Sequence, residues 1–376
     1  DVIWVTNGVY ATGSVRAGKS DDYSNNPASC LSRVALTNAV RVESVNGPAW
    51  TRIVGARSAD AGGFGSNSVR CVYLAAGAEL AGFTLTNGFA GGAGPWGETT
   101  GNGGGAYLDR GGMISNCVVV ACAAIGDEGS RGGGDGGGGV FLNQGGTVRY
   151  STILSNRTDY GDGGGVHANL GGTIEFCEIR GNTAGSPDEE VSGGGVYLKG
   201  EGAALRDCLV EGNSANEFGG GIGLYWVGTV VERCRVYRNH APYGGGFGAP
   251  YGSQPPHRVA NCDIAFNRAD EWGGGVVSSS SHIILDGCWI HDNVSGSNGG
   301  ALAGDQGSIN VVNCTIERNE AAHSAGGVNY GTCINSIVYN NRLTGPNPTR
   351  GTENYVALAT SFRNSCTFPL PASGPG

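Results

Sequence analysis

The fold is decided by two elements that eleven residues separate, Gly273-Gly274-Gly275-Val276 and Cys288-Trp289-Ile290-His291-Asp292-Asn293. Both elements return together along the chain. The Cys-to-Asn element begins, in steps of 26 to 31 residues, at Cys177, Cys208, Cys234, Cys262, Cys288 and Cys314. A repeat of nearly constant length in this range is typical of a repeat protein.

The residues within one repeat alternate between apolar and polar, as in the stretch from Thr173 to Ile179. Such alternation indicates a half-buried strand. One repeat cannot bury its inner face alone, whereas parallel strands stacked in register at about 4.8 Å can. We therefore expect an all-β fold, a right-handed three-sheet parallel β-helix of about twelve coils. Its three strands per coil would lie at residues 193–198, in a segment ending near Cys208, and after Asn213.

The Cys-to-Asn frame extends further when the Cys position is allowed to vary. It then includes 82–87, 117–122, 151–156 and 336–341. Asparagine tolerates the left-handed conformation, and its amide can bond the Asn of the next coil. We expect one internal column of stacked asparagines, and a local gap in it at Cys122. The column would hold Asn156, Asn182, Asn213, Asn239, Asn267, Asn293 and Asn319.

The domain organisation follows from the repeats. We expect a single β-helix domain over residues 1–376, with less regular coils at 1–81, regular repeats at 82–341 and an irregular segment at 342–376. The chain opens on an apolar strand, Asp1 to Val5, and ends in a Pro-rich run. These features predict a fragment of a longer secreted protein, located outside the cell or on a bacterial cell surface.

Composition narrows the classes of partner. The net charge is −9, and Lys19 and Lys199 are the two lysines of the sequence. This balance argues against nucleic acid, whose affinity comes from phosphate neutralisation. No run of about 20 apolar residues occurs, so no transmembrane segment is expected. No cofactor is expected either, although a structural calcium is left open.

Glycine triplets occur at 163–165, 193–195, 219–221, 244–246 and 273–275. Glycine weakens a strand, so the triplets need a reason. One is structural, namely a positive φ at a sharp entry or a close approach of stacked backbones. The other is functional, because a wall of glycine lets a ligand lie against the backbone.

The twelve cysteines divide into two groups. The ladder cysteines share one inward position, and in-register stacking at about 4.8 Å holds them too far apart for a disulfide, which needs about 3.8 Å between Cβ atoms. We expect buried thiols that pack as small hydrophobic groups. Off the ladder, we expect a disulfide between Cys333 and Cys366, and with less support one between Cys30 and Cys71.

The loops before the glycine triplets carry the candidate ligand-binding residues. Stacking would bring Phe218, Tyr243 and Trp272 to the same place on three successive coils. Aromatic rings flanked by carboxylates are suited to pyranose rings. The alternatives are that the rings cap the core and the acids are solvated, that paired acids hydrolyse a glycosidic bond, or that they bind calcium. The flanking acids are Glu217, Asp270 and Glu271, with Glu189 and Glu190 one loop earlier.

The following strands add further candidates. Tyr225 and Trp226 are expected to face the same ligand. A β-elimination lyase needs a base and a cation that neutralises a uronate. The nearby candidates are Arg131, His167 and Lys199, which lie on different coils without a signature spacing.

A family resemblance rests on paired elements such as Gly299-Gly300-Ala301-Leu302 with Ile316-Glu317-Arg318-Asn319. They resemble the passenger repeats of the chlamydial polymorphic outer-membrane proteins. The resemblance implies a secreted or surface-displayed bacterial β-helix of the pectate-lyase-like kind, with an adhesive role, and it carries no catalytic residue over. The Gly-Gly-Gly triplets and the cysteine ladder depart from that family's pattern.

The expected function is therefore that of an extracellular structural or adhesive β-helix. Its loop face would contact carbohydrate or a surface protein, and its open strand edges could associate end to end, as in a filament. The alternative is a polysaccharide lyase or glycoside hydrolase that uses the acidic residues of the loop face.

Overall fold

The computed structural model describes residues 1–17, 30–59, 61–91, 101–126, 134–185, 190–226, 228–252, 255–305, 308–345, 353–356 and 360–368. It contains two compact units, Asp1–Ala204 and Leu205–Gly376. The single domain expected from the sequence stays a prediction. Among the described residues, no helix has the length and apolar character needed to cross a membrane.

Each coil runs through four strands, as one coil of the first unit illustrates. The chain passes from β19 (Val166–Asn169) through β20 (Gly172–Glu175) and β21 (Glu178–Arg180) to β22 (Thr183–Ala184). It then enters β23 (Val196–Lys199), which pairs in parallel with β19 one coil earlier. The fold is thus the expected parallel β-helix. The expectation of three strands per coil is wrong, because the residues between the Cys and Asn corners form a strand of their own.

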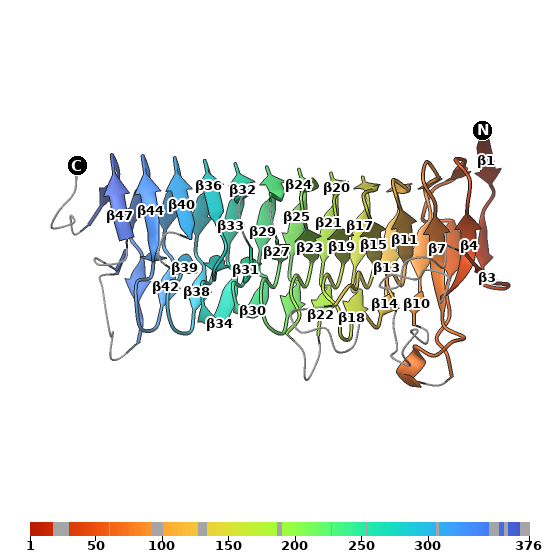
Figure 1. The fold of residues 1–376 in the computed structure, drawn as a ribbon, viewed down its shortest axis with the longest axis horizontal. Helices are drawn as coiled ribbons and strands as arrows, with labels where there is room; N and C mark the ends of the chain where they lie inside the picture. Colours follow the sequence, from red (N-terminus) through yellow and green to blue (C-terminus); the bar gives the residue numbers. More distant parts are fainter. Residues whose placement is uncertain are drawn as a thin grey trace. The chain divides into compact units, whose positions relative to one another are not determined.

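The strands of the first unit fall into four rows, which can be followed in Figure 1. We call the rows sheets A to D. Sheet A holds β1 (Val2–Val5), β5 (Arg41–Ser44), β8 (Glu79–Ala81), β12 (Met113–Ser115), β16 (Thr147–Arg149) and β20. Sheet B holds β2 (Gly8–Tyr10), β6 (Thr51–Val54), β9 (Thr84–Thr86), β13 (Val118–Val120), β17 (Thr152–Leu154) and β21. Sheet C holds β3 (Val15–Arg16), β4 (Leu31–Leu36), β7 (Val69–Leu74), β11 (Ala106–Asp109), β15 (Val140–Asn143), β19 and β23; sheet D holds β10 (Phe89–Ala90), β14 (Ala123–Ala124), β18 (Arg157–Thr158) and β22.

The second unit repeats the four rows, and β24 (Ala203–Arg206) spans the boundary. Sheet A holds β28 (Val230–Glu232), β32 (His257–Ala260), β36 (Ile283–Asp286), β40 (Ile309–Val312), β44 (Gly331–Ile334) and β47 (Thr360–Arg363). Sheet B holds β25 (Leu209–Glu211), β29 (Arg235–Tyr237), β33 (Asp263–Ala265), β37 (Trp289–His291), β41 (Thr315–Glu317), β45 (Ile337–Tyr339) and β48 (Cys366–Thr367). Sheet C holds β27 (Ile222–Tyr225), β31 (Phe247–Ala249), β35 (Val276–Ser278), β39 (Leu302–Gly304) and β43 (Val328–Asn329); sheet D holds β26 (Ser214–Ala215), β30 (His240–Tyr243), β34 (Arg268–Trp272), β38 (Val294–Ser295), β42 (Glu320–Ala321) and β46 (Arg342–Leu343).

The core consists of apolar columns that run through each unit. In sheet B of the second unit, register places Val236, Ile264, Ile290 and Ile316 above one another, and all four are fully buried. Burying one such side chain contributes about 1.5–3 kcal/mol. Because the side-chain period of a strand is two, the residues on either side of each apolar residue point outward and are available for function.

The asparagine column is confirmed within each unit. Asn156 Nδ2 donates to Asn182 Oδ1 (3.0 Å) in the first unit, and Asn267 Nδ2 donates to Asn293 Oδ1 (2.9 Å) in the second. The left-handed conformation, however, belongs to the residue before each asparagine, such as Phe266 (φ 58°) and Asp292 (φ 53°). This position differs from expectation because the bend lies at the exposed residue, and the buried asparagine keeps its N–H for the next amide: Asn267 N donates to Asn293 Oδ1 (3.0 Å).

Two segments depart from the regular Cys-to-Asn frame. Cys122 occupies the asparagine position, where its N–H donates to Asn156 Oδ1 (3.0 Å). A local gap was expected there, but the amide column ends at this coil. The frame assigned to 82–87 is wrong by one residue. Val118 pairs with Thr84, which places Phe83 level with Cys117. The shift arises because Asn87 itself has φ 51° and forms the bend.

The cysteines are all free thiols, and both expected disulfides are wrong. Cys333 lies on β44 of sheet A, whereas Cys366 lies on β48 of sheet B. The Sγ atoms of Cys30 and Cys71 instead donate to the carbonyl oxygens of Gly91 (3.4 Å) and Thr86 (3.3 Å).

The ladder thiols are hydrogen-bonded, which the expectation of purely apolar packing missed. Cys314 Sγ donates to the carbonyl of Val312 (3.1 Å) and accepts from Cys288 N (3.3 Å). One coil further on, Ser336 Oγ accepts from Cys314 N at 3.1 Å. Thiol and hydroxyl therefore fill the same role at this corner.

The glycine triplets have structural causes, as Gly273 to Gly275 show. Gly273 has φ 68°, where an L side chain is strained. A Cβ on Gly274 would lie 2.5 Å from the carbonyl oxygen of Gly300, and one on Gly275 would lie 2.7 Å from that of Ala301. The close approach of stacked backbones thus explains the second and third glycines.

Candidate functional site

The aromatic residues expected at the same place on successive coils do lie next to one another. Phe218 pairs with Tyr243, and Tyr243 pairs with Trp272, across successive coils of the second unit. The Phe218 and Tyr243 rings are 5.2 Å apart and inclined by 27°, and the Tyr243 and Trp272 rings are 5.6 Å apart and inclined by 70°. We call these three residues the aromatic strip.

Local structure explains why the strip lies where it does. Its residues immediately precede the glycine turns that lead into sheet C, and the pairing of β30 with β34 shifts register between Ala241 and Tyr243. Gly248 makes room for Phe218, because a Cβ on Gly248 would lie 2.8 Å from the Cβ of Phe218. On the next coils Asn298 and then Ser324 take the equivalent position. The strip therefore ends at Trp272, whose side chain is 43% exposed.

Carboxylates surround the strip as expected. Burial, followed by the negative charges of Glu217 and Glu271, raises the pKa of Tyr243. Asp270 Oδ2 lies 3.0 Å from His240 Nε2, and Asp270 Oδ1 lies 3.5 Å from Arg268 Nε. Both Asp270 and His240 are exposed, so these surface contacts are worth little for stability.

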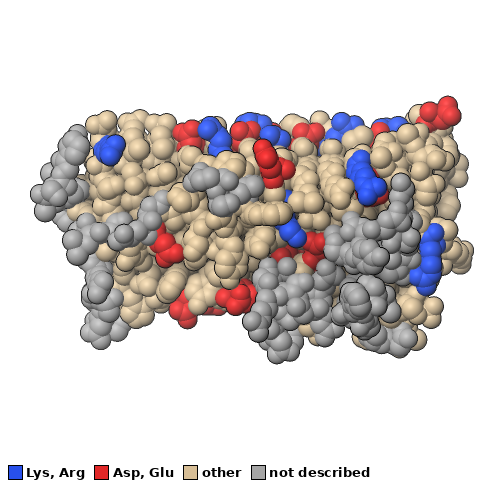
Figure 2. All heavy atoms as spheres, viewed as in Figure 1, with Lys and Arg blue, Asp and Glu red and all other residues tan. Residues whose placement is uncertain are grey.

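The arginines of the second unit are largely engaged by acids. Arg233 binds Asp207 through two hydrogen bonds of 2.8 Å, and Arg238 Nη1 lies 2.7 Å from Glu211 Oε1. Basic and acidic side chains lie interspersed along the upper edge of the face drawn in Figure 2. The arrangement leaves little positive charge to attract a polyanion.

Tyr225 and Trp226 lie at the far end of β27 from Phe218. The Tyr225 ring meets the Tyr251 ring edge to face at 6.2 Å, and Trp226 is exposed with φ 76°. The two aromatic groups therefore stand at opposite ends of one strand of sheet C, rather than in one continuous stack.

Of the other candidates, His167 lies on β19 of the first unit and is fully buried. Its Nε2 is 3.5 Å from Asp135 Oδ1, and Lys199 Nζ donates a hydrogen bond to that oxygen at 3.1 Å. Burial lowers the pKa of His167 to about 4, so the ring is neutral at pH 7. Glu190 is exposed, while Glu189 and Arg131 lie outside the described residues.

Sequence reasoning missed the partners of His167. Asp162 is buried and accepts from Ser192 N (2.7 Å), and burial raises its pKa well above the usual range. The His167 ring lies between Phe141 and Tyr197, with centroids 5.1 and 5.0 Å away. The signal for this aromatic column was present, because each member is the second residue after its glycine run and alternation points it outward.

The arrangement favours binding over catalysis. The strip offers an exposed indole beside carboxylates that can accept hydrogen bonds from hydroxyl groups. The buried His167 cluster has the residues of an acid–base centre but little access. Within the described ranges, no group of three or more His, Cys, Asp and Glu side chains is placed to hold a metal ion, so no residues are assigned to calcium.

Curated protein sequences gave no match. Three solved structures resemble the chain at low identity. The A-module of a mannuronan C-5 epimerase from Azotobacter vinelandii has TM-score 0.46 and 12% identity over 98% of this chain and 91% of that one. A mannuronic acid-specific family 6 polysaccharide lyase from human gut microbiota has TM-score 0.39 and 9% identity (96% and 81%), and a family 28 exopolygalacturonase from Yersinia enterocolitica has TM-score 0.31 and 10% identity (97% and 72%).

A match to a protein-family model establishes the family of the chain. A family model described as a right-handed β-helix region matches residues 138–343, which is more than half of the chain. It fits the parallel pairing of successive coils in both units and supplies the handedness expected from the sequence. The chain therefore belongs to the right-handed β-helix family.

Proposed function

We propose that the protein is an extracellular, adhesive β-helix whose aromatic strip binds polysaccharide. The observation that carries the proposal is the stacking of Phe218, Tyr243 and Trp272 on successive coils, with the indole of Trp272 exposed. An exposed indole does not add to the core, whereas its face suits the apolar face of a sugar ring.

The charges around the strip favour a neutral polysaccharide. The negative charges of Glu217 and Glu271 contribute to the raised pKa of Tyr243, and Asp270 lies on β34 together with Trp272. Their carboxylates can accept hydrogen bonds from sugar hydroxyls but would repel uronate or sulfate groups. A surface protein is the second partner class, which the resemblance to chlamydial passenger repeats suggests.

The test compares polysaccharide binding by the wild type, Trp272→Ala and Trp50→Ala. Trp50 is a matched control, because it is an exposed tryptophan of the first unit. Stacking on one ring contributes on the order of 1 kcal/mol, so Trp272→Ala is expected to weaken binding about fivefold. Thermal stability should stay nearly unchanged. Affinity gel electrophoresis over a panel of neutral polysaccharides measures the first quantity and calorimetry the second.

Two results would contradict the proposal. Equal binding by Trp272→Ala and the wild type would show that the strip is not part of the binding site. A large loss of stability in Trp272→Ala would show that the strip caps the core.

The second candidate function is a polysaccharide lyase or glycoside hydrolase. The observation that favours it is the cluster of Asp135, His167 and Lys199, which combines a neutral imidazole, a carboxylate and a cation. Incubation with polysaccharides, followed by assay of new reducing or unsaturated ends, decides between the candidates. Ends produced by the wild type and lost in His167→Gln would establish the enzyme.

A further inference from the structure

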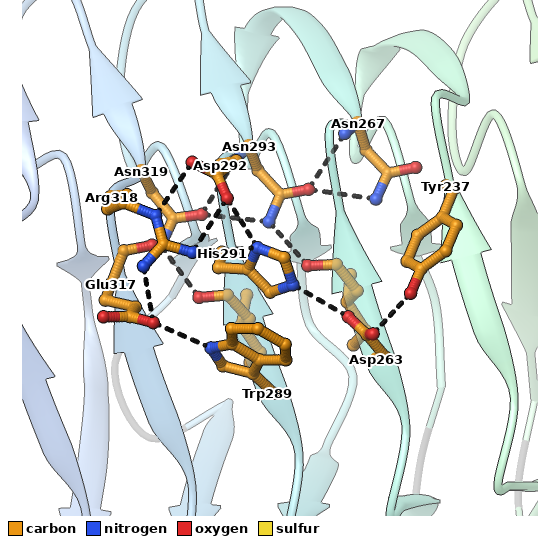
Figure 3. Close-up of polar contacts among 12 residues, drawn as sticks. Tyr237, Asp263, Asn267, Trp289, His291, Asp292, Asn293, Glu317, Arg318 and Asn319 are labelled. Carbon is orange, nitrogen blue, oxygen red and sulfur yellow. Dashed lines mark hydrogen bonds and ion pairs between the residues drawn. The ribbon is translucent and has the colours of Figure 1, made fainter.

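A second exposed tryptophan lies on sheet B of the second unit. Trp289, on β37, is 42% exposed. Figure 3 shows its indole beside the imidazole of His291, and the two rings are 3.7 Å apart and inclined by 27°. The indole Nε1 donates to Glu317 Oε1 at 3.1 Å. One face and one edge of the indole are therefore fixed by the protein.

The imidazole behind Trp289 is itself held at both nitrogens. His291 Nε2 lies 2.9 Å from Asp263 Oδ1, and Nδ1 lies 2.6 Å from Asp292 Oδ2. Tyr237 donates its hydroxyl to the other oxygen of Asp263. Space for this contact comes from Ala265, the small residue that stands between Tyr237 and His291 in the column.

Arg318 links the two acidic residues of the network, Asp292 and Glu317. Arg318 Nε and Nη2 donate to the two oxygens of Asp292, both at 3.1 Å. Arg318 Nη1 lies 2.7 Å from Glu317 Oε1, the atom that also accepts from the indole. A chain of hydrogen bonds through successive coils thus fixes the orientation of one exposed ring. Support of this kind around a surface side chain is what a pre-organised binding residue requires.

A neighbouring aromatic residue is difficult to explain by stability alone. Phe266 is 49% exposed and has φ 58°, and its ring centroid is 5.8 Å from that of His291. Equivalent corners carry Asp292, Arg318 and Asn340, which are polar. A bulky side chain in the left-handed region is strained, and about half of Phe266 stays exposed. Contact with a ligand accounts for both.

We propose that Trp289, with Phe266 beside it, is a second carbohydrate-binding site that stacks on a pyranose ring of a neutral polysaccharide. The arginine of the network is neutralised by two carboxylates, so the site offers no free cation for an anionic sugar. It lies on sheet B, whereas Tyr243 and Trp272 of the aromatic strip lie on strands of sheet D. The inference shares its ligand class with the proposed function but uses different residues.

The test uses the full chain and affinity electrophoresis in gels that contain a soluble β-glucan, a mannan or a xylan. The variants are Trp289→Ala, Trp272→Ala and the control Trp50→Ala, an exposed tryptophan of the first unit. We expect Trp289→Ala to weaken retention about fivefold and Trp50→Ala to leave it unchanged. A fourth variant, His291→Ala, removes the ring that packs against the indole. It should weaken retention and reduce the change in indole fluorescence on binding.

The outcomes separate the two sites. If only Trp289→Ala loses retention, the second site binds the polysaccharide and the aromatic strip does not. If only Trp272→Ala loses retention, the second site is overturned. Loss in both supports two sites. Wild-type retention by Trp289→Ala together with a lower melting temperature would show that the network only stabilises the fold. Failure of the wild-type protein to be retained by any of the three polysaccharides would also overturn the inference.

Discussion

At the scale of single residues, the Cys-to-Asn corners show how hydrogen bonding decides which substitutions the coil accepts. Cys314 Sγ both donates and accepts a bond to the backbone, and Ser336 takes the same position one coil later. The sequence predicted that these cysteines are buried and unpaired. It did not predict their hydrogen bonds, because a thiol is usually treated as a small apolar group.

The first prediction follows from that equivalence. Cys314→Ser should leave stability within about 1 kcal/mol of the wild type, while Cys314→Ala should lower it by about 1–3 kcal/mol. The alanine variant leaves the N–H of Cys288 and the carbonyl of Val312 without this partner. Urea unfolding of both variants measures the difference. If the alanine variant proved as stable as the serine variant, the thiol would be no more than packing.

His167 supplies a prediction about pH. Its folded-state pKa of about 4 lies below the usual value of about 6.5, so the unfolded chain binds a proton more readily over that interval. This residue therefore costs stability as the pH falls from about 6.5 to 4, by roughly 1.4 kcal/mol per unit at most. Asp162 opposes the trend, because its raised pKa favours the folded state in acid.

The variant His167→Gln isolates the histidine from that opposing carboxylate. It should lose less stability than the wild type between pH 6.5 and pH 4. Melting temperatures across this range measure the two slopes. Parallel slopes would mean that the buried imidazole is not neutral in the folded state.

At the scale of the element, the amide column links successive coils at one corner. Asn267 donates to Asn293 and to the carbonyl of Val236, and it accepts from both nitrogens of Asn239. Replacing it with alanine leaves several buried polar groups unpaired. We expect Asn267→Ala to cost about 3 kcal/mol or more, since each unsatisfied group costs roughly 1–3 kcal/mol.

The control for that change is Asn313→Ala, because Asn313 is exposed and lies at the other corner of the coil. Chemical denaturation compares the two variants. Similar losses would show that the column is not the source of stability.

The number of strands per coil could not be predicted, and the reason is visible at the corners. Short strands are normally bounded by Gly, Asn or Pro. In some coils Phe176, Arg238 and Phe266 hold the left-handed conformation instead, so those corners carried no turn signal. The aromatic strip could be predicted because its members share one offset from the glycine triplets. The Trp289 network could not, since its contacts join different positions on neighbouring coils.

At the scale of the whole molecule, the two units differ in where their polar chemistry lies. The first unit encloses Asp135, Asp162 and His167 beneath the surface. The second unit exposes Trp272 and Trp289 on separate sheets. The buried groups have little access to a ligand, whereas the two exposed indoles can contact one.

The first coil of the first unit supports a prediction about association. Strand β1 pairs with β5, and no strand within the described ranges pairs with its other edge. Val2, Ile3 and Trp4 of this strand are exposed, Trp4 by 62%. An open, apolar edge offers unpaired N–H and C=O groups to a second strand. We therefore expect the chain to associate through this edge as its concentration rises.

Light scattering across a concentration series measures the association, and Trp4→Lys is the variant that should abolish it. A lysine on an edge strand places charge where a partner strand would pair, which disfavours edge-to-edge contact. Trp50→Lys, which changes another exposed tryptophan of the first unit away from β1, controls for the loss of exposed apolar surface. A constant monomeric mass for the wild type at every concentration would exclude the edge as an association surface. An equal effect of the two lysine variants would point instead to association through exposed side chains rather than through the backbone of β1.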